Sequence, residues 1–212
     1  MRRAALLAVA VLGALPAAAP ADGDPASDVL IAQDVYYPYA PKVARPLATA
    51  LDALLKRVRT AGYPMKVALI QTPADLGAYP SLFGDSQRYA DLLAKEISFN
   101  SRPHLLVVMP SGFAGDNLGP KVDEALSGIG VDQAAKSDGL VLAGLAAVAK
   151  IASSNGHPTP VPAAAATKVA ASKASSKRST PSLLVYGGPV LLVAIAVGAL
   201  LYTGRRREDE PA

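Results

Sequence analysis

Residues 183–202 form an uncharged run, LLVYGGPVLLVAIAVGALLY, that begins at Leu183 and ends at Tyr202. A helix of this length is about 30 Å long, which matches the hydrocarbon core of a bilayer. Arginines at 205–207 follow directly, and basic residues beside a span mark its cytoplasmic side. The sequence therefore predicts a single-pass anchor in the cell membrane, with a cytoplasmic tail at 203–212 and the rest of the chain outside.

Residues 1–21, MRRAALLAVAVLGALPAAAPA, have the order of features that defines a secretory signal peptide. A basic start precedes an apolar run, Pro16 interrupts that run, and Ala19 and Ala21 occupy the small-x-small positions of a cleavage site. We expect cleavage after Ala21. An uncleaved anchor is the alternative, and either form exports the segment that follows.

The basic excess of the chain lies outside its patterned middle. The formal net charge is +4, yet residues 22–151 hold 12 Lys and Arg against 14 Asp and Glu, a net charge of −2. A mildly acidic domain is a poor partner for nucleic acid, and we predict no such partner. The chain also has no cysteine, which excludes disulfides, thiolate metal sites and thiol nucleophiles.

Residues 28–151 are long and patterned enough to bury a hydrophobic core. Short, nearly continuous apolar runs alternate there with amphipathic helical patterns, as is typical of parallel strands covered on both faces. The predicted elements are a strand at 29–32, a helix at 46–60, a strand at 66–70, a helix at 86–98, a strand at 105–109 and a helix at 140–153. The order strand, helix, strand from 66 to 109 predicts a right-handed parallel crossover. We therefore expect one small α/β domain with a central, mostly parallel sheet flanked by helices.

Residues 152–182 are rich in Pro, Ala, Ser and Lys and lack apolar periodicity. Such a composition cannot bury enough surface to offset the entropy of ordering the chain. We predict a disordered linker that holds the domain away from the bilayer.

Two loops follow the carboxyl ends of the central strands, where open α/β sheets bind ligands. They contain Asp75 and Asp85 in the segment 71–85 and Asp116 in the segment 110–120. Carboxylates in such loops suit a hard divalent cation, so these three aspartates are the candidate ligands for a calcium ion. Aspartates also serve as helix caps and turn residues, and that alternative stays open.

The second loop also suggests a binding role for its backbone. Gly112 and Gly115 permit a close approach of the chain to a ligand, and Asn117 offers an amide oxygen. A plain flexible connection is the alternative. Its match to phosphate-binding loops is poor, because no Gly-Lys-Ser/Thr ending is present.

An aromatic cluster of Tyr36, Tyr37 and Tyr39 surrounds Pro38. Exposed tyrosines stack on sugars or peptides, whereas buried ones close the edge of a sheet, and the sequence leaves both interpretations open. Motifs for hydrolysis are missing: the chain has neither a Gly-x-Ser-x-Gly nor a His-Glu-x-x-His pattern.

The segments ALDALLKRVRTAGYP, KVALIQT, YADLLAKEIS and LLVVMP, set between a signal peptide and a span, resemble the TPM domain family over residues 28–151. The resemblance implies an α/β fold and, as in members of that family, either an accessory role or an acid phosphatase activity, often with calcium. The chain has Ser101, Arg102 and Pro103 where the family commonly has an acidic Asp-Asn-Gly turn.

The first functional hypothesis is therefore a membrane-tethered exported domain with a binding or accessory role in the cell envelope and an envelope protein as its partner. The alternative is a divalent-metal-dependent phosphatase that uses the loop aspartates. The sequence alone does not decide whether the protein is an enzyme.

Overall fold

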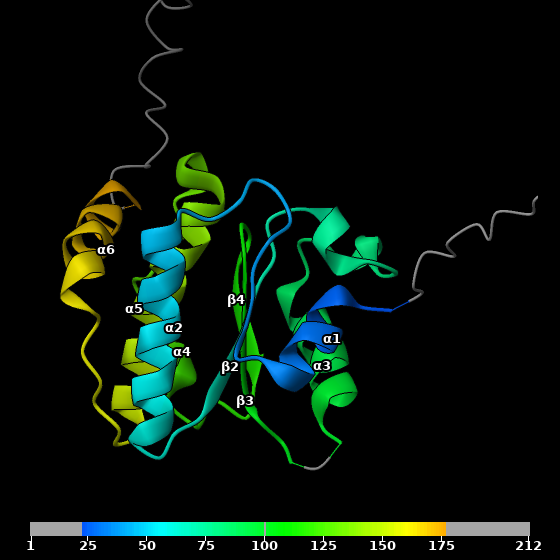
Figure 1. Cartoon of the computed structure of the whole chain (residues 1–212), viewed down its shortest axis with the longest axis horizontal. Helices are drawn as coiled ribbons and strands as arrows, with labels where there is room; N and C mark the ends of the chain where they lie inside the picture. Colours follow the sequence, from blue (N-terminus) through cyan, green and yellow to red (C-terminus); the bar gives the residue numbers. More distant parts are fainter. Residues whose placement is uncertain (1–22, 100, 177–212) are drawn as a thin grey trace, which may run out of the picture. The chain divides into compact units, whose positions relative to one another are not determined.

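The computed structural model describes residues 23–99 and 101–176. The predicted signal peptide, membrane span, cytoplasmic tail and the end of the predicted linker lie outside these residues. Within them, the chain up to Lys173 belongs to one compact unit with a four-stranded sheet and helices on both faces (Figure 1). The predicted α/β fold with a sheet flanked by helices is confirmed.

The sheet has the order β1-β2-β3-β4 and is mostly parallel. β1 (Val35–Tyr36), β2 (Met65–Leu69) and β3 (His104–Met109) run parallel, and β4 (Gly112–Asp116) pairs with β3 antiparallel. The two central strands were predicted at 66–70 and 105–109, and both are confirmed. They are buried on both faces, which explains their continuous apolar character.

The predicted strand at 29–32 is wrong, because these residues end a helix, α1 (Pro25–Ala32). Asp24 caps this helix by accepting a hydrogen bond from the Ala26 N–H at 3.0 Å, and Pro25 occupies its first turn. These start signals lie ahead of the predicted domain boundary at 28. The short apolar run therefore looked like a strand although it is the end of a helix.

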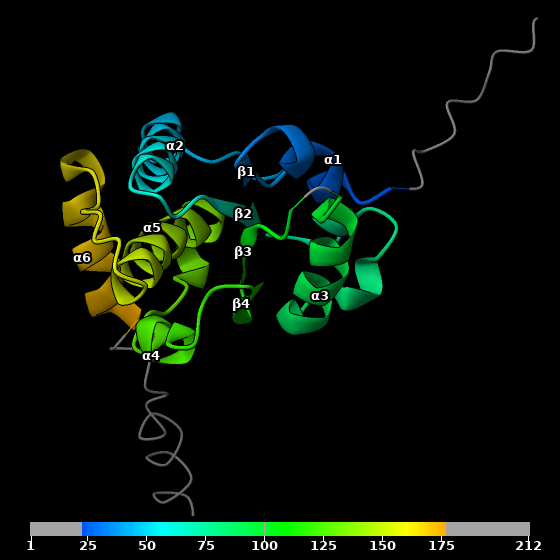
Figure 2. The same ribbon diagram turned by 90° about the horizontal axis from the view of Figure 1, so that it is seen from below.

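The helices divide between the two faces of the sheet (Figure 2). α2 (Arg45–Thr60) and α5 (Lys136–Ser154) cover one face, and α1 and α3 (Ser86–Ile97) cover the other. The helices predicted at 46–60, 86–98 and 140–153 are confirmed. Two connections join the parallel strands: β1 to β2 through α2, and β2 to β3 through α3. Both step across the sheet in the same direction, but their helices lie on opposite faces, so the two connections have opposite hands. One of them is left-handed, which is rare among parallel connections.

α5 is the central helix of its face. Its apolar residues pack against α2 and the sheet, and most of the helix is buried. Among the described residues, the helix that spans Gln133–Ser154, including the short turn η3 (Gln133–Ala135), is long and apolar enough to cross a membrane. Its burial in the core accounts for this composition.

The segment 110–120, predicted as a glycine-rich loop, contains a strand at its centre. β4 occupies Gly112–Asp116, and the short helix α4 (Val122–Leu126) follows it. The first loop, 71–85, is confirmed as a connection and contains two 3-10 turns, η1 (Pro73–Leu76) and η2 (Pro80–Leu82).

The predicted disordered linker at 152–182 is also corrected, because a helix occupies residues 163–176. Residues Ala163–Ser176 form helix α6 beside α5 (Figure 1). Ala165 is 1% exposed, and Val161 and Val169 pack against the core. Alanine favours helix, and two valines and one alanine at suitable spacing are enough to attach it, although the segment is too polar to show a clear apolar pattern.

Candidate functional site

Asp75, a predicted metal ligand, is 0% exposed and binds its own loops instead. Its Oδ1 accepts from the Tyr39 N–H at 2.8 Å. Its Oδ2 accepts from the N–H groups of Gln71 at 2.9 Å and Thr72 at 2.7 Å and from the Thr72 hydroxyl at 3.2 Å. The carboxylate therefore ties the loop after β1 to the loop after β2.

The three tyrosines do not form one surface. Tyr36 is 2% exposed and donates its hydroxyl to the Asp75 carbonyl at 3.2 Å. Tyr37 lies on the opposite face of the sheet and donates to the Ala48 carbonyl at 3.0 Å and to Asp52 Oδ1 at 2.8 Å. Tyr39 alone of the three is exposed, at 58%, and meets Tyr36 edge-on.

Asp85 and Asp116 also have structural partners. Asp85 caps α3 by accepting from the Arg88 N–H at 3.1 Å. Asp116 forms a bidentate pair with Arg102, with Nε and one terminal nitrogen at 2.8 and 2.6 Å from its two oxygens. These hydrogen bonds to Arg102 hold the pKa of the Asp116 carboxyl below its usual value.

The three aspartates are not brought together. Asp75 follows the carboxyl end of β2, whereas Asp116 pairs with Leu105 near the amino end of β3, at the other end of the sheet. Across residues 23–99 and 101–176, no cluster of three or more His, Asp or Glu side chains is placed to hold a metal ion. The geometry gives the predicted calcium site no common centre.

The predicted backbone-binding residues belong to the β3–β4 hairpin. Gly112 and Gly115 lie in β4, and a Cβ at Gly115 would stand 2.3 Å from both the Leu105 carbonyl oxygen and a Leu118 methyl group. Asn117 adopts φ 57° and donates its side-chain N–H to the Arg102 carbonyl at 3.0 Å. Gly115 is thus required for packing inside the protein.

A buried acid at the start of α1 was missed by the sequence analysis. Asp24 is 1% exposed, and both of its oxygens accept from the Tyr89 hydroxyl at 2.8 Å. Burial raises the pKa of Asp24 to about 6, although the hydrogen bonds from Tyr89 and from the Ala26 N–H oppose the shift. A single acid between Gly and Pro carries no sequence signal for such a role except as a helix cap.

Both histidines stack on Tyr63 at the amino end of β2. The ring centroids lie 4.0 Å apart for His104 and 5.4 Å apart for His157. The His157 Nδ1–H donates to the Ala61 carbonyl at 2.6 Å, and Tyr63 donates its hydroxyl to the Leu118 carbonyl at 2.9 Å. These contacts fix the chain after α5 to the end of α2.

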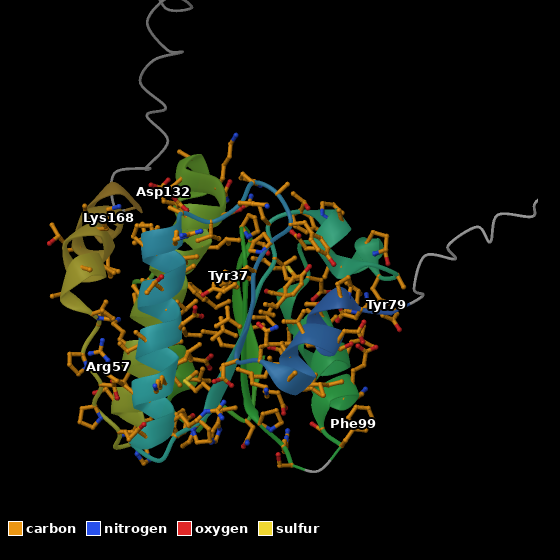
Figure 3. All side chains as sticks on the ribbon, viewed as in Figure 1. Tyr37, Arg57, Tyr79, Phe99, Asp132 and Lys168 are labelled. Atoms are coloured by element: carbon orange, nitrogen blue, oxygen red, sulfur yellow. The ribbon has the colours of Figure 1, made fainter. Side chains whose placement is uncertain are left out.

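One side of the domain, which we call the β4 face, is hollowed in two places. A hollow of about 650 Å³, the charged hollow, lies between α3 and the Arg102–Asp116 pair. It is lined by Asp91, Ala94, Lys95, Ser98, Phe99, Ser101, Arg102 and Asp116. Phe99 is 76% exposed and stands at the outer end of α3 (Figure 3).

A second hollow of about 310 Å³, the edge groove, runs beside β4. Its lining comes from α3, β4, the loop after β4 and α4. These residues are Gln87, Phe113, Ala114, Gly115, Asn117, Leu118, Gly119, Val122, Asp123 and Leu126. Both hollows lie along the open edge of the sheet, beside α3 and β4. A further hollow of about 240 Å³ lies beside α5, where Leu142 and Val169 line it.

The described residues thus define a three-layer α/β domain with an open β4 face. Comparison with known proteins finds no matching family model, no matching curated protein and no matching solved structure. The resemblance to the TPM family stays a prediction.

Proposed function

We propose that this protein is a membrane-tethered exported domain that binds an envelope protein through its β4 face and has an accessory role. The observation that supports the proposal is the exposed Phe99 at the charged hollow. A large aromatic side chain that is 76% exposed loses much contact with water when a partner covers it. Exposed aromatic side chains next to arginine are typical of the centres of protein interfaces.

The charges around Phe99 suit a protein partner. Arg102 keeps 68% of its side chain exposed while it holds Asp116, so its guanidinium is fixed in place but open on one side. Asp91 and Lys95 add one charge of each sign to the same hollow. Mixed charges beside an apolar side chain give specificity for a matching polypeptide surface.

Photo-cross-linking in cells tests this proposal. A photoreactive benzoylphenylalanine replaces Phe99 in the full chain, and the same residue replaces Ile31, which is 57% exposed on α1, as the control. We expect a discrete protein adduct from position 99 that is at least about fivefold stronger than from position 31, because only the first lies on the β4 face. Replacing Arg102 with Glu should reduce that adduct. Equal adducts at both positions, or none, contradict the proposal.

The alternative function is the divalent-metal phosphatase. Asp75, Asp85 and Asp116 would have to leave their present partners and move together to share an ion, so the geometry does not favour it. A calcium titration followed by thermal melting tests it directly. A melting temperature that rises with calcium and no longer does so in Asp116→Ala would support the alternative.

A further inference from the structure

β4 is the last strand of the sheet, so one of its two edges has no partner strand among the described residues. The edge groove lies along that edge. Figure 2 shows β4 at the end of the sheet, with α4 on one side of it and α3 on the other. Gln87 of α3 lines one side of the groove and Val122 and Leu126 of α4 line the other, while residues 113–115 lie between them. The open strand is therefore recessed between two helices that lie on opposite faces of the sheet.

The register of the hairpin shows which backbone groups face the groove. Met109 pairs with Gly112 across a two-residue loop. Residues that flank such a loop exchange backbone hydrogen bonds, and in an antiparallel pair every second residue then turns its N–H and C=O outward. In β4 these residues are Phe113 and Gly115, and both line the edge groove.

β4 lacks the features that usually protect an open edge. Natural edge strands carry lysine, proline or a bulge that prevents pairing. The segment Gly112–Asp116 contains neither lysine nor proline, and its register with β3 is unbroken. Gly115 has no side chain that would keep another backbone away.

The position of β4 between α3 and α4 limits which kind of polypeptide can pair with its edge. A second copy of this domain would bring its own α3 and α4 to the same edge, whereas a single extended chain has no flanking helices to accommodate. We infer that β4 accepts an extended segment of the partner protein as a fifth strand. This inference rests on the proposed protein-binding function and adds the mode of binding, since backbone pairing at a sheet edge is a common way to bind peptides.

The lining of the groove specifies the chemistry of the segment. Phe113, Leu118, Val122 and Leu126 give an apolar surface for side chains of the segment that point toward α4. Asp123 is the charged residue of this lining, so a lysine or arginine is favoured beside it and an acid is disfavoured. The preferred ligand is an extended segment with alternating apolar residues and at least one basic residue.

Two substitutions at one position separate backbone pairing from side-chain contact. Phe113→Pro removes an outward backbone N–H but leaves the hydrogen bonds between β4 and β3 in place. Edge strands tolerate proline at such outward positions. Phe113→Val keeps the N–H and an apolar side chain. In cells that carry the Phe99 photoreactive residue, we expect the proline variant to lose at least about fivefold in adduct yield, and the valine variant to lose less than twofold.

A peptide keeps the inference testable if the proline variant does not fold. The acetylated hexapeptide Thr-Val-Thr-Lys-Thr-Val, whose valines and lysine point to the same side of the strand, is titrated into the full chain in detergent micelles, and backbone amide signals are followed by NMR. We expect binding below about 1 mM and shifts centred on Phe113 and Gly115. The same peptide methylated on its interior backbone nitrogens should bind at least about tenfold more weakly, since it cannot donate to the edge.

The results distinguish the two proposals. A Phe99 adduct that is equally strong in both Phe113 variants overturns strand addition and leaves the protein-binding function in place. Peptide binding centred on Phe113 without any Phe99 adduct supports strand addition and counts against the proposed envelope partner. No binding of the unmethylated peptide, or equal binding of both peptides, overturns strand addition.

Discussion

Replacing Asp24 with Asn should remove a pH dependence from the stability of the domain. Burial raises the pKa of Asp24 from 3.8 to about 6 in the folded protein, and the carboxyl returns to the ordinary value in the unfolded chain. Between these two values the folded state holds a proton that the unfolded state has released. The contribution of this proton to the free energy of unfolding is complete below about pH 3.8 and is lost as the pH rises to about 6.

The size of the effect follows from the shift. The two pKa values differ by about 2 units, and each unit corresponds to about 1.4 kcal/mol, so the folded protein loses about 3 kcal/mol through this group over the whole titration. About 2.4 kcal/mol of this loss falls between pH 4 and pH 7, because the unfolded carboxyl is already more than half ionised at pH 4. Asn keeps the shape of the side chain and an oxygen that accepts from Tyr89, but it does not ionise. The stability of Asp24→Asn relative to the wild type should therefore rise by about 2.4 kcal/mol between pH 4 and pH 7.

Urea denaturation followed by circular dichroism measures this difference at several pH values between 4 and 7. Subtracting the wild type cancels the titration of all other groups, which the two proteins share. Gln33→Ala, at an exposed position after α1, removes no ionisable group and is the control, so its difference should not change with pH. A difference for Asp24→Asn that is constant with pH, or that falls as the pH rises, would refute the burial argument.

Three further substitutions test the packing of the fold, two by the same denaturation assay and one by proteolysis. Asp75→Ala should lower the free energy of unfolding by about 3 kcal/mol, because it leaves the Tyr39 N–H and the other buried donors of this carboxylate without an acceptor. A loss of stability that depends on added calcium would contradict this structural role. Gly115→Ala should lower the free energy of unfolding by about 1–3 kcal/mol, since the added Cβ would stand 2.3 Å from the Leu105 carbonyl oxygen. An unchanged stability would contradict this close packing of the hairpin. Ala165→Asp should detach α6 and speed its proteolysis, because this position is 1% exposed; unchanged proteolysis would place α6 elsewhere.

The central strands could be predicted because their physical cause is local. β2 and β3 are covered on both faces, so each appears in the sequence as a continuous apolar run. α2 and α3 could be predicted for a similar reason, since each has one buried face and one solvent-exposed face. Their caps and breaks, such as Asp85 before α3, lie next to them in the chain.

The elements that the sequence missed depend on distant contacts. β4 is rich in glycine because Gly115 must pass close to Leu105 and Leu118, and glycine in a sequence indicates a loop more often than a strand. α1 is short, and its cap precedes the expected start of the domain. Neither cause is visible in the local pattern of hydrophobic residues.

The role of the loop aspartates could not be predicted for a different reason. A carboxylate that binds calcium and one that binds backbone N–H groups look alike in a sequence, because both follow a strand and both stand beside turn residues. The partner decides between them. Asp75 has nearby donors in Gln71 and Thr72, and its distant donor is the Tyr39 N–H, 36 residues earlier in the chain.

These internal bonds also explain why the predicted metal ligands do not form a site at the carboxyl ends of the strands. Open α/β sheets commonly bind ligands at the carboxyl ends of their strands. In this protein, carboxylates at that end bind backbone groups of the chain. Asp75 accepts from the Tyr39 N–H at 2.8 Å, and Asp138 at the start of α5 accepts from the Ala44 N–H at 2.8 Å. The same carboxylates that would hold a ligand there satisfy the loops instead. The outward backbone groups of β4 at Phe113 have no partner strand among the described residues. A test at that edge therefore discriminates more sharply than any substitution of the aspartates, which already have partners inside the protein.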